Sequence, residues 1–166
     1  RRERGDHWRD TTIPLDMRSK LGVRIHGCDR CQEACPRNQK KVNGIFPKDA
    51  FLEILKNKMN LSDMLLMTDA YYTRWIYPVM YNYIEDKRLF QRNAAVAMGN
   101  TRDDQYIPAL QQALCLQDGM IRSHVAWALG RIGGKKAKDI LEKRWRSEAS
   151  AAVKKEISYA LSRCES

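Results

Sequence analysis

Hydrophobic residues in the second half of the chain recur at helical spacing, and the pattern then repeats as a block. Residues 91–99 read QRNAAVAMG and residues 122–130 read RSHVAWALG, which places Gly99 and Gly130 31 residues apart. A weaker copy, KKEISYALS, follows 32 residues later at 154–162. Amphipathic segments at 107–114 and 137–145 lie between the copies. Two helices in each unit of about 31 residues predict a helical solenoid.

The residue types within the copies suggest how the predicted helices pack. Small residues that would let paired helices approach closely are Ala94, Ala95, Ala97, Ala126 and Ala128. Larger residues that would fill the seam between units are Val96, Met98, Trp127 and Leu129. Gly99 and Gly130 are expected to permit the left-handed turn that ends the first helix of each unit. His124, which lies in such a first helix, is expected to be a structural histidine with satisfied hydrogen bonds.

The chain before the repeats divides into a helical part and an irregular part. Pro47 suits the first turn of one helix, and Ser62–Asp63 can cap a second. Thr68–Asp69 can cap a third helix over residues 70–84, which Pro78 should kink or break. The sequence therefore predicts an all-α fold with an irregular segment at 1–45, linking helices at 46–84 and a repeat domain at 85–166.

Within the irregular segment, one short helix is predicted from Leu15 to Leu21. Gly22 is expected to end this helix, because glycine tolerates the left-handed conformation that follows many helices.

Charge adds a possible partner to this picture. The 166 residues carry a formal net charge of +10, which is divided into +5 over residues 1–45, zero over 46–84 and +5 over 85–166. Two basic zones suggest a polyanionic partner, although a solvated basic surface would give the same composition. No run of about eighteen apolar residues exists, so no membrane span is predicted. The first residues contain no apolar stretch and no initiator Met, which favours a fragment of a longer parent over a secreted chain.

Three of the five cysteines lie within eight residues, as Cys28, Cys31 and Cys35, with Pro36 after the third. This spacing is typical of a ferredoxin-like cluster loop, in which the cysteine before proline ligates a second cluster. Each [4Fe–4S] cluster takes four ligands, so the missing cysteines are expected N-terminal to Arg1. The alternatives to a cluster loop are a zinc site, in which His26 or His7 completes the three cysteines, and three free thiols. Clustered thiols without export features favour the cytoplasm. Two further cysteines, Cys115 and Cys164, are expected to act as small hydrophobic residues.

Two blocks of the chain resemble one enzyme family. The residues Thr12-Ile13-Pro14, Leu21-Gly22 and IHGCDRCQEACP at 25–36 resemble the second cluster motif of epoxyqueuosine reductases. These are cobalamin-dependent, double-cluster iron–sulfur enzymes that complete queuosine on the wobble base of tRNA. Met67-Thr68-Asp69 and RNAAVAMGN at 92–100 resemble the HEAT-like C-terminal domain of the same family. This chain departs from the family pattern at Arg37, where tryptophan is usual, and at 77–86, where a basic approach to the repeats is usual.

The resemblance implies a division of labour. Cys28 and Cys31 would ligate one [4Fe–4S] cluster of the parent, and Cys35 would ligate the other. Cobalamin and the catalytic residues would belong to missing N-terminal domains, so this chain carries no catalytic residue. The HEAT-like array would bind the anticodon arm of tRNA through phosphate contacts.

Nine basic residues are candidates for those phosphate contacts. Six occupy matching positions in successive units and would form a stripe, and three follow the first helix of the second unit. The stripe contains Lys87, Arg88, Arg92, Arg122, Lys154 and Lys155, and the second group contains Arg131, Lys135 and Lys136. Some of these basic residues could instead form ion pairs with Glu85, Asp86 or Glu156 and would then not contact phosphates. A protein-interaction scaffold with a zinc loop, or a corrinoid iron–sulfur reductase with a small-molecule substrate, are alternative functions.

Overall fold

The computed structural model describes residues 12–39, 49–79 and 86–164, and no strand occurs in these ranges. Before the repeats lie α1 (Leu15–Arg18), the 3₁₀ turn η2 (Ser19–Leu21), α2 (Arg30–Ala34), α4 (Ala50–Lys58), α5 (Leu61–Leu65), α6 (Asp69–Tyr71) and the π-helical turn η3 (Tyr72–Ile76). The repeats comprise α7 (Lys87–Thr101), the 3₁₀ turn η4 (Asp104–Tyr106), α8 (Ile107–Ala113), α9 (Gly119–Ile132), α10 (Gly134–Ser147) and α11 (Ala151–Cys164). The all-α prediction is confirmed for the part of the chain that the structure describes.

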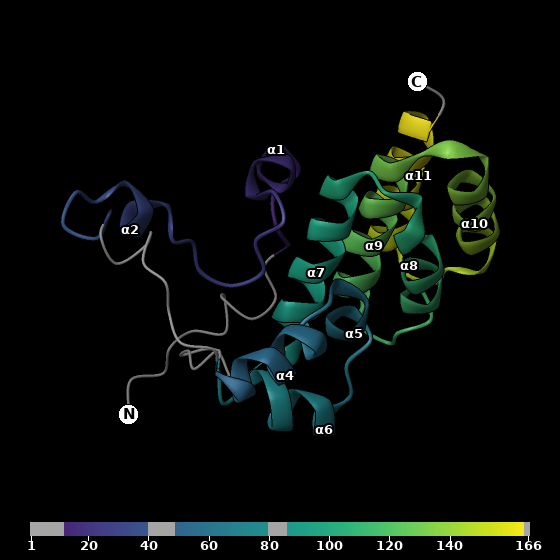
Figure 1. Cartoon of the computed structure of the whole chain (residues 1–166). Helices are drawn as coiled ribbons and strands as arrows, with labels where there is room; N and C mark the ends of the chain where they lie inside the picture. The colour runs from purple at the N-terminus through teal and green to yellow at the C-terminus, as the bar shows by residue number, and fades with distance from the viewer. Residues whose placement is uncertain (1–11, 40–48, 80–85, 165–166) are drawn as a thin grey trace, which may run out of the picture.

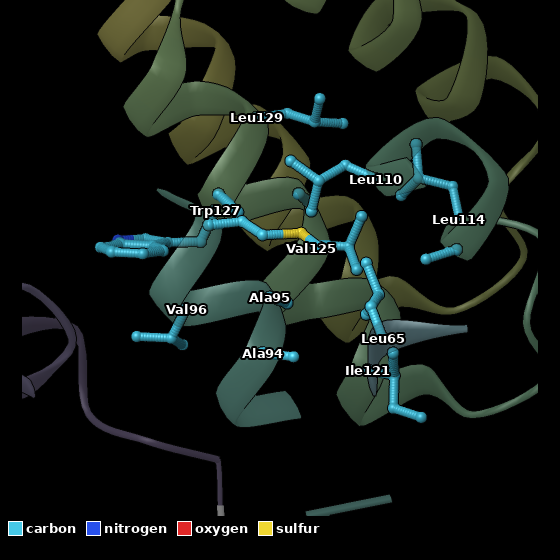
Figure 2. Close-up of a cluster of buried hydrophobic side chains, with 14 of the residues drawn as sticks. Leu65, Ala94, Ala95, Val96, Leu110, Leu114, Ile121, Val125, Trp127 and Leu129 are labelled. Carbon is cyan, nitrogen blue, oxygen red and sulfur yellow. The ribbon is translucent and has the colours of Figure 1, made fainter. Parts of the chain in front are cut away.

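The repeats form a two-layered array. Helices α7, α9 and α11 lie side by side in one layer, and α8 and α10 form the second layer, to the right in Figure 1. The core lies between the layers, where Ala95, Leu110, Val125 and Leu129 are fully buried (Figure 2). The predicted solenoid is therefore confirmed, with the first helices of the units in one layer and the second helices in the other.

Gly99 and Gly130 do not end their helices, so the prediction made for them is wrong. Both lie inside α7 and α9, which end instead at Arg102 (φ 56°) and Gly133 (φ 75°). A Cβ on Gly99 would lie 2.8 Å from the Cα of Ala128, and one on Gly130 would lie 2.7 Å from the Cβ of Ala160. The two glycines are needed because neighbouring helices touch at these points, which leaves no room for a side chain.

The short helices before the array are set by side-chain caps. The hydroxyl of Thr68 accepts a hydrogen bond from the backbone N–H of Tyr71, which confirms the predicted cap. Helix α5 is capped by Asn60 rather than by Ser62–Asp63, because the Asn60 side chain accepts from the Asp63 N–H. The predicted 70–84 helix is shorter than expected, since α6 continues only through η3 to a turn at Tyr77–Val79.

Some predictions fall outside the described residues. These include Pro47, His7 and both domain boundaries, at 45/46 and at 84/85. The helix predicted from Leu15 is confirmed as α1 followed by η2, and Gly22 (φ 61°) ends it as expected. None of the helices in the described ranges is long and apolar enough to cross a membrane.

Candidate functional site

Residues 13–26, here called the strap, lead from the N-terminal side into the cysteine loop and lie against α7, α9 and α11. Figure 1 shows α1 beside the upper half of α7. The strap begins where the backbone N–H of Ile13 donates to Nε2 of His124 at 3.0 Å. It ends where the ring of His26 packs 5.7 Å from the ring of Phe90 in α7. The strap therefore covers part of the layer formed by the first helices of the repeats.

Arg18 fixes the middle of the strap to two repeats. The residue is only 2% exposed, and its Nη1 donates to Oε1 of Glu156 in α11 at 2.6 Å. Its Nε donates to the Ile13 carbonyl at 2.8 Å, and its guanidinium lies 5.7 Å from the ring centroid of Trp127 in α9. A charge-assisted hydrogen bond and a cation–π contact are thus made by one buried side chain.

Two asparagines of α7 hold the second half of the strap. Asn100 Nδ2 donates to the carbonyls of Arg18 at 2.8 Å and Gly22 at 2.9 Å. Asn93 Nδ2 donates to the carbonyl of Ile25 at 2.7 Å. The role of these asparagines was not predicted from the sequence. The sequence feature that could have indicated this role is the presence of two amide side chains in a helix otherwise rich in alanine and other apolar residues.

His124 is structural, as predicted. It is fully buried, its Nδ1 lies 2.8 Å from the Met120 carbonyl, and its Nε2 accepts from Ile13. Because a backbone N–H can only donate, Nε2 must be the acceptor and Nδ1 must carry the proton. Burial, with a smaller contribution from the charges of Arg18 and Arg92, lowers the pKa of His124 to about 3. The ring is therefore a neutral acceptor for the strap.

The three clustered cysteines follow the strap. Cys28 and Cys31 are exposed, and Cys35, at the C-terminal end of α2, is half-buried; all three are free thiols. Gly27 (φ 67°) turns the chain into the loop. A hollow of about 420 Å³ separates this loop from α4 and α5, and it is lined by residues 23–30, Glu33, Met59 and Met64. The loop is thus reachable from solvent while its entrance is fixed on the array.

The donor chemistry of the loop suits an iron–sulfur cluster, but the donor set is incomplete. Nowhere in the described ranges do three or more His, Cys, Asp or Glu side chains converge to hold a metal ion. His26, a proposed zinc ligand, contacts Phe90 instead. Three thiols at the C-x₂-C-x₃-C-P spacing fit a shared cluster framework that needs further cysteines.

The predicted basic stripe is altered by ion pairs. Lys87 Nζ lies 2.6 Å from Asp69, and Arg88 pairs with Asp86 at 2.7 Å and with Asp118 at 3.1 Å. These hydrogen bonds raise the pKa of Arg88. Arg92 is half-buried beside the strap, and burial lowers its pKa. The first repeat therefore presents less free positive charge than the sequence pattern suggested.

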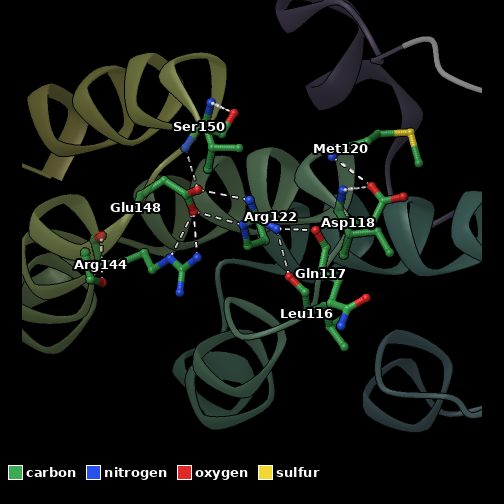
Figure 3. Close-up of polar contacts among 11 residues, drawn as sticks. Leu116, Gln117, Asp118, Met120, Arg122, Arg144, Glu148 and Ser150 are labelled. Atoms are coloured by element: carbon green, nitrogen blue, oxygen red, sulfur yellow. Dashed lines mark hydrogen bonds and ion pairs between the residues drawn. The ribbon is translucent and has the colours of Figure 1, made fainter.

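Arg122 is not a surface residue, which corrects its assignment as a phosphate contact. It is 9% exposed, and its Nε and Nη2 each donate to Glu148 at 2.9 Å (Figure 3). Its Nη1 donates to the Leu116 carbonyl at 2.9 Å and also to that of Gln117. Glu148 is 3% exposed. Its pKa is lowered to about 2, mainly because Arg122 donates hydrogen bonds to its carboxylate. Arg122 thus joins consecutive units internally.

The remaining basic candidates lie at the surface or near it. Lys135 and Lys136 in the first turn of α10, and Lys155 in α11, are exposed. Lys154 is half-buried, with its Nζ 5.4 Å from the ring centroid of Trp145. Arg131, in the last turn of α9, is half-buried. Among the nine candidates, the exposed cations are therefore concentrated in the second and third units.

Comparison with known proteins agrees with this architecture. The family model for HEAT repeats matches residues 82–162. An uncharacterized protein of Geobacillus stearothermophilus is 33% identical over 148 residues, which cover 87% of this chain and 67% of that protein. An epoxyqueuosine reductase of Bacillus subtilis is 31% identical over 151 residues, which cover 90% of this chain and 38% of that enzyme.

A solved structure extends the match to three dimensions. The crystal structure of an epoxyqueuosine reductase with an epoxyqueuosine-modified tRNA-Tyr stem loop has a TM-score of 0.76 and 26% identity. The match covers 93% of this chain and 41% of that one. Fold and repeats define a HEAT-repeat protein with an appended cysteine loop. The chain belongs to the epoxyqueuosine reductase-like family, in which it corresponds to a C-terminal part, and it spans about two fifths of the length of the reductases it matches.

Proposed function

We propose that this chain is the part of an epoxyqueuosine reductase-like oxidoreductase that supplies cluster ligands and docks the anticodon arm of tRNA. The observation that carries the proposal is the strap, which fixes a three-thiol loop onto a HEAT-repeat array. The match to an epoxyqueuosine reductase covers 90% of the chain, so it includes residues of both the cysteine loop and the repeats. We place this work in the cytoplasm, where clustered thiols remain reduced.

Within the proposal, each thiol has a separate task. Cys28 and Cys31 ligate one [4Fe–4S] cluster and Cys35, which precedes Pro36, ligates the second. The clusters, when bound, supply one-electron transfer to the cobalamin that the parent enzyme holds. The strap orients the loop, because its backbone leads directly into Gly27 and Cys28. This backbone is fixed by Arg18 of the strap and by Asn100 and His124 of the array.

The array contributes RNA affinity. Lys135, Lys136 and Lys155 are exposed cations, and Arg131 and Lys154 lie at the half-buried margin of the same units. Contacts between such cations and phosphates fix orientation and carry little sequence information. Lys87 and Arg88 can contribute only by exchanging the carboxylates that now pair with them.

Metal analysis of the anaerobically prepared full-length parent tests the cluster assignment. Roughly eight iron atoms per chain and a broad visible absorption are expected if both clusters assemble. Cys28→Ser and Cys35→Ser should each reduce the iron content by about half while altering different clusters in the electron paramagnetic resonance spectrum. Stoichiometric zinc with no visible absorption would refute the proposal and favour the zinc-loop scaffold.

Titration of the present chain with an RNA stem-loop at two salt concentrations tests the docking assignment. Binding should weaken steeply between about 50 and 200 mM salt, because each phosphate contact releases counterions. Affinity that is absent, or that does not change with salt, would contradict RNA docking by the array.

A further inference from the structure

Three arginines gather where the parallel helices α7, α9 and α11 end. The contacts of Gly99 with Ala128 and of Gly130 with Ala160 hold these helices together close to their C-terminal ends. Arg102, Arg131 and Arg163 each lie within three residues of one of these contacts, on successive helices. The C-terminal ends of α7, α9 and α11 lie at the same edge of the array (Figure 1), so the three arginines follow one another along that edge, and the charges of Arg102 and Arg163 act on Arg131.

No carboxylate of the described residues forms an ion pair with these arginines. Arg163 donates through Nη1 to the Tyr159 hydroxyl at 3.0 Å and stacks 5.8 Å from the same ring. The Nε–H of Arg131 is buried and has no acceptor among the described residues. Asp103, beside Arg102, directs its carboxylate to Gln105. The arrangement leaves positive charge uncompensated, in contrast to the paired Arg88 and Arg122.

Electrostatics at Arg131 agree with this geometry. Burial lowers the pKa of Arg131, and the charges of Arg102 and Arg163 lower it further. A buried guanidinium N–H without an acceptor also carries an uncompensated desolvation cost. An anion bound at this edge would offset both the mutual repulsion and part of that cost.

The turn that follows Arg131 continues the positive edge. Gly133 and Gly134 have φ values of 75° and 81°, and the space at both Cα atoms is open. The exposed Lys135 and Lys136 come next, in the first turn of α10. Helix α10 has no side-chain cap, whereas α7 and α9 are capped by aspartates. Two cations at a positive helix end oppose the helix dipole, so this turn favours an anion as well.

We propose that Arg102, Arg131 and Arg163 form a binding site for consecutive phosphates of an RNA backbone, extended by Lys135 and Lys136. Packed helices lie about 8–10 Å apart, so a row across three helices is roughly 16–20 Å long. A row of this length suits a polymer of phosphates rather than one free phosphate. The inference rests on the RNA docking proposed above and names the residues that would make the contacts.

Charge removal with a matched control tests the site. The variant R102Q/R131Q/R163Q should bind an RNA stem-loop about 10- to 100-fold more weakly at low salt, and the slope of log K against log salt should fall by about 2–3. The control K56Q/K143Q/R146Q removes three exposed cations from α4 and α10 and should leave the slope unchanged. R102K/R131K/R163K keeps the charges and should retain most of the slope.

Two further measurements keep the outcomes separable. R102Q/R163Q alters only exposed side chains and should lower the slope by about 1–2 with an unchanged circular dichroism spectrum. Inorganic phosphate and sodium chloride at equal ionic strength should compete equally, and selective displacement by phosphate would assign the site to a free anion and overturn the inference. If the wild-type chain binds RNA and the triple glutamine variant behaves like the control, the inference fails while RNA docking stands. If the wild-type chain binds no RNA, both fail.

Discussion

The repeat array at 86–164 and the strap with its cysteine loop at 12–39 are stabilised in different ways. The array is held by close apolar packing, with Ala95, Val125 and Leu129 fully buried between its layers (Figure 2). In the strap, Leu15, Met17 and Val23 are exposed, and Ile13, Leu21 and Ile25 pack against the core but are only partly buried. The strap is held mainly by polar side chains that belong to the array.

This difference shows where the position of the thiol loop is determined. The array can define its own geometry through contacts between neighbouring units, as repeat proteins do. The strap takes its geometry from Asn93, Asn100, His124 and Glu156, which lie 68 to 138 residues further along the chain from their partners. Substitutions should therefore separate loss of the array from release of the strap.

The largest effect is expected for Glu148→Ala. The substitution leaves Arg122 buried and without its partner, which typically costs about 3–5 kcal/mol. Urea unfolding followed by circular dichroism would measure the loss, and Asp139→Asn, at an exposed carboxylate, is the control. A loss below about 1 kcal/mol would show that the buried pair does not stabilise the array.

In the wild-type chain the contribution of Glu148 to the free energy of unfolding is present above pH 4.5 and is lost as pH falls toward 2.

The next effect is the pH dependence that His124 imposes. Its ring is neutral in the folded state, so stability is complete above pH 6.5 and falls as pH decreases toward 3. Between pH 6.5 and 4.5 the free energy of unfolding should fall by roughly 2–3 kcal/mol, with a limiting slope of about 1.4 kcal/mol per pH unit. His124→Gln should remove this dependence, because glutamine keeps an acceptor and does not titrate. Equal slopes in both proteins would refute the assignment.

An intermediate effect is expected for Gly130→Ala. The added methyl group would overlap Ala160, which should force α9 and α11 apart at a cost of about 1–3 kcal/mol. Gly119→Ala is the matched control, because its Cβ would lie 3.6 Å from Val153, an ordinary contact distance. Thermal unfolding of both variants would measure the difference. Equal stability of the two would mean that the helices can separate freely.

Asn100→Ala should release part of the strap and leave the array intact. Two hydrogen bonds to the Arg18 and Gly22 carbonyls are lost, and each contributes about 0.5–1.5 kcal/mol. Amide hydrogen exchange should accelerate across residues 13–26 and remain unchanged in α9. Asn57→Ala, on the exposed face of α4, should change neither region. Acceleration throughout the array would contradict the separation of the two regions.

The smallest effect is expected for K135Q/K136Q, and its sign is opposite. Removal of two cations from the positive end of α10 should raise stability by about 0.3–1 kcal/mol. RNA affinity should fall in the same variant, because both lysines extend the proposed phosphate site. Chemical unfolding and RNA titration on the same preparation would reveal both changes. A loss of stability would show that the lysines have structural partners.

The sequence predicted those parts of the fold that depend on neighbouring residues. Apolar spacing located the repeat helices, and turn residues such as Thr68 and Gly22 located short caps and breaks. The role of Gly99 and Gly130 was mistaken because the distance between two packed helices is a tertiary property. In both cases the preference of glycine for a left-handed turn was the only local signal.

The candidate site was predicted less completely, for the same reason. The spacing of Cys28, Cys31 and Cys35 is local and was recognisable in the sequence. The burial of Arg122 depends on Glu148, 26 residues later, and no local pattern distinguishes it from a surface arginine. Gln91, at the equivalent position of the preceding unit, is also buried and donates to the Leu65 carbonyl, so a buried polar side chain recurs at this position.

The ion pair between Arg18 and Glu156 has a consequence for how such a chain can change over evolution. Helical arrays commonly gain or lose terminal units, because each unit contacts only its neighbours. Here α11 also anchors a residue 138 positions earlier, so deletion of this helix would release the segment that leads to the thiols. The presence of α11 is therefore tied to the geometry of the distant thiol loop, and an array without this helix would be expected only together with a different attachment of residues 13–26.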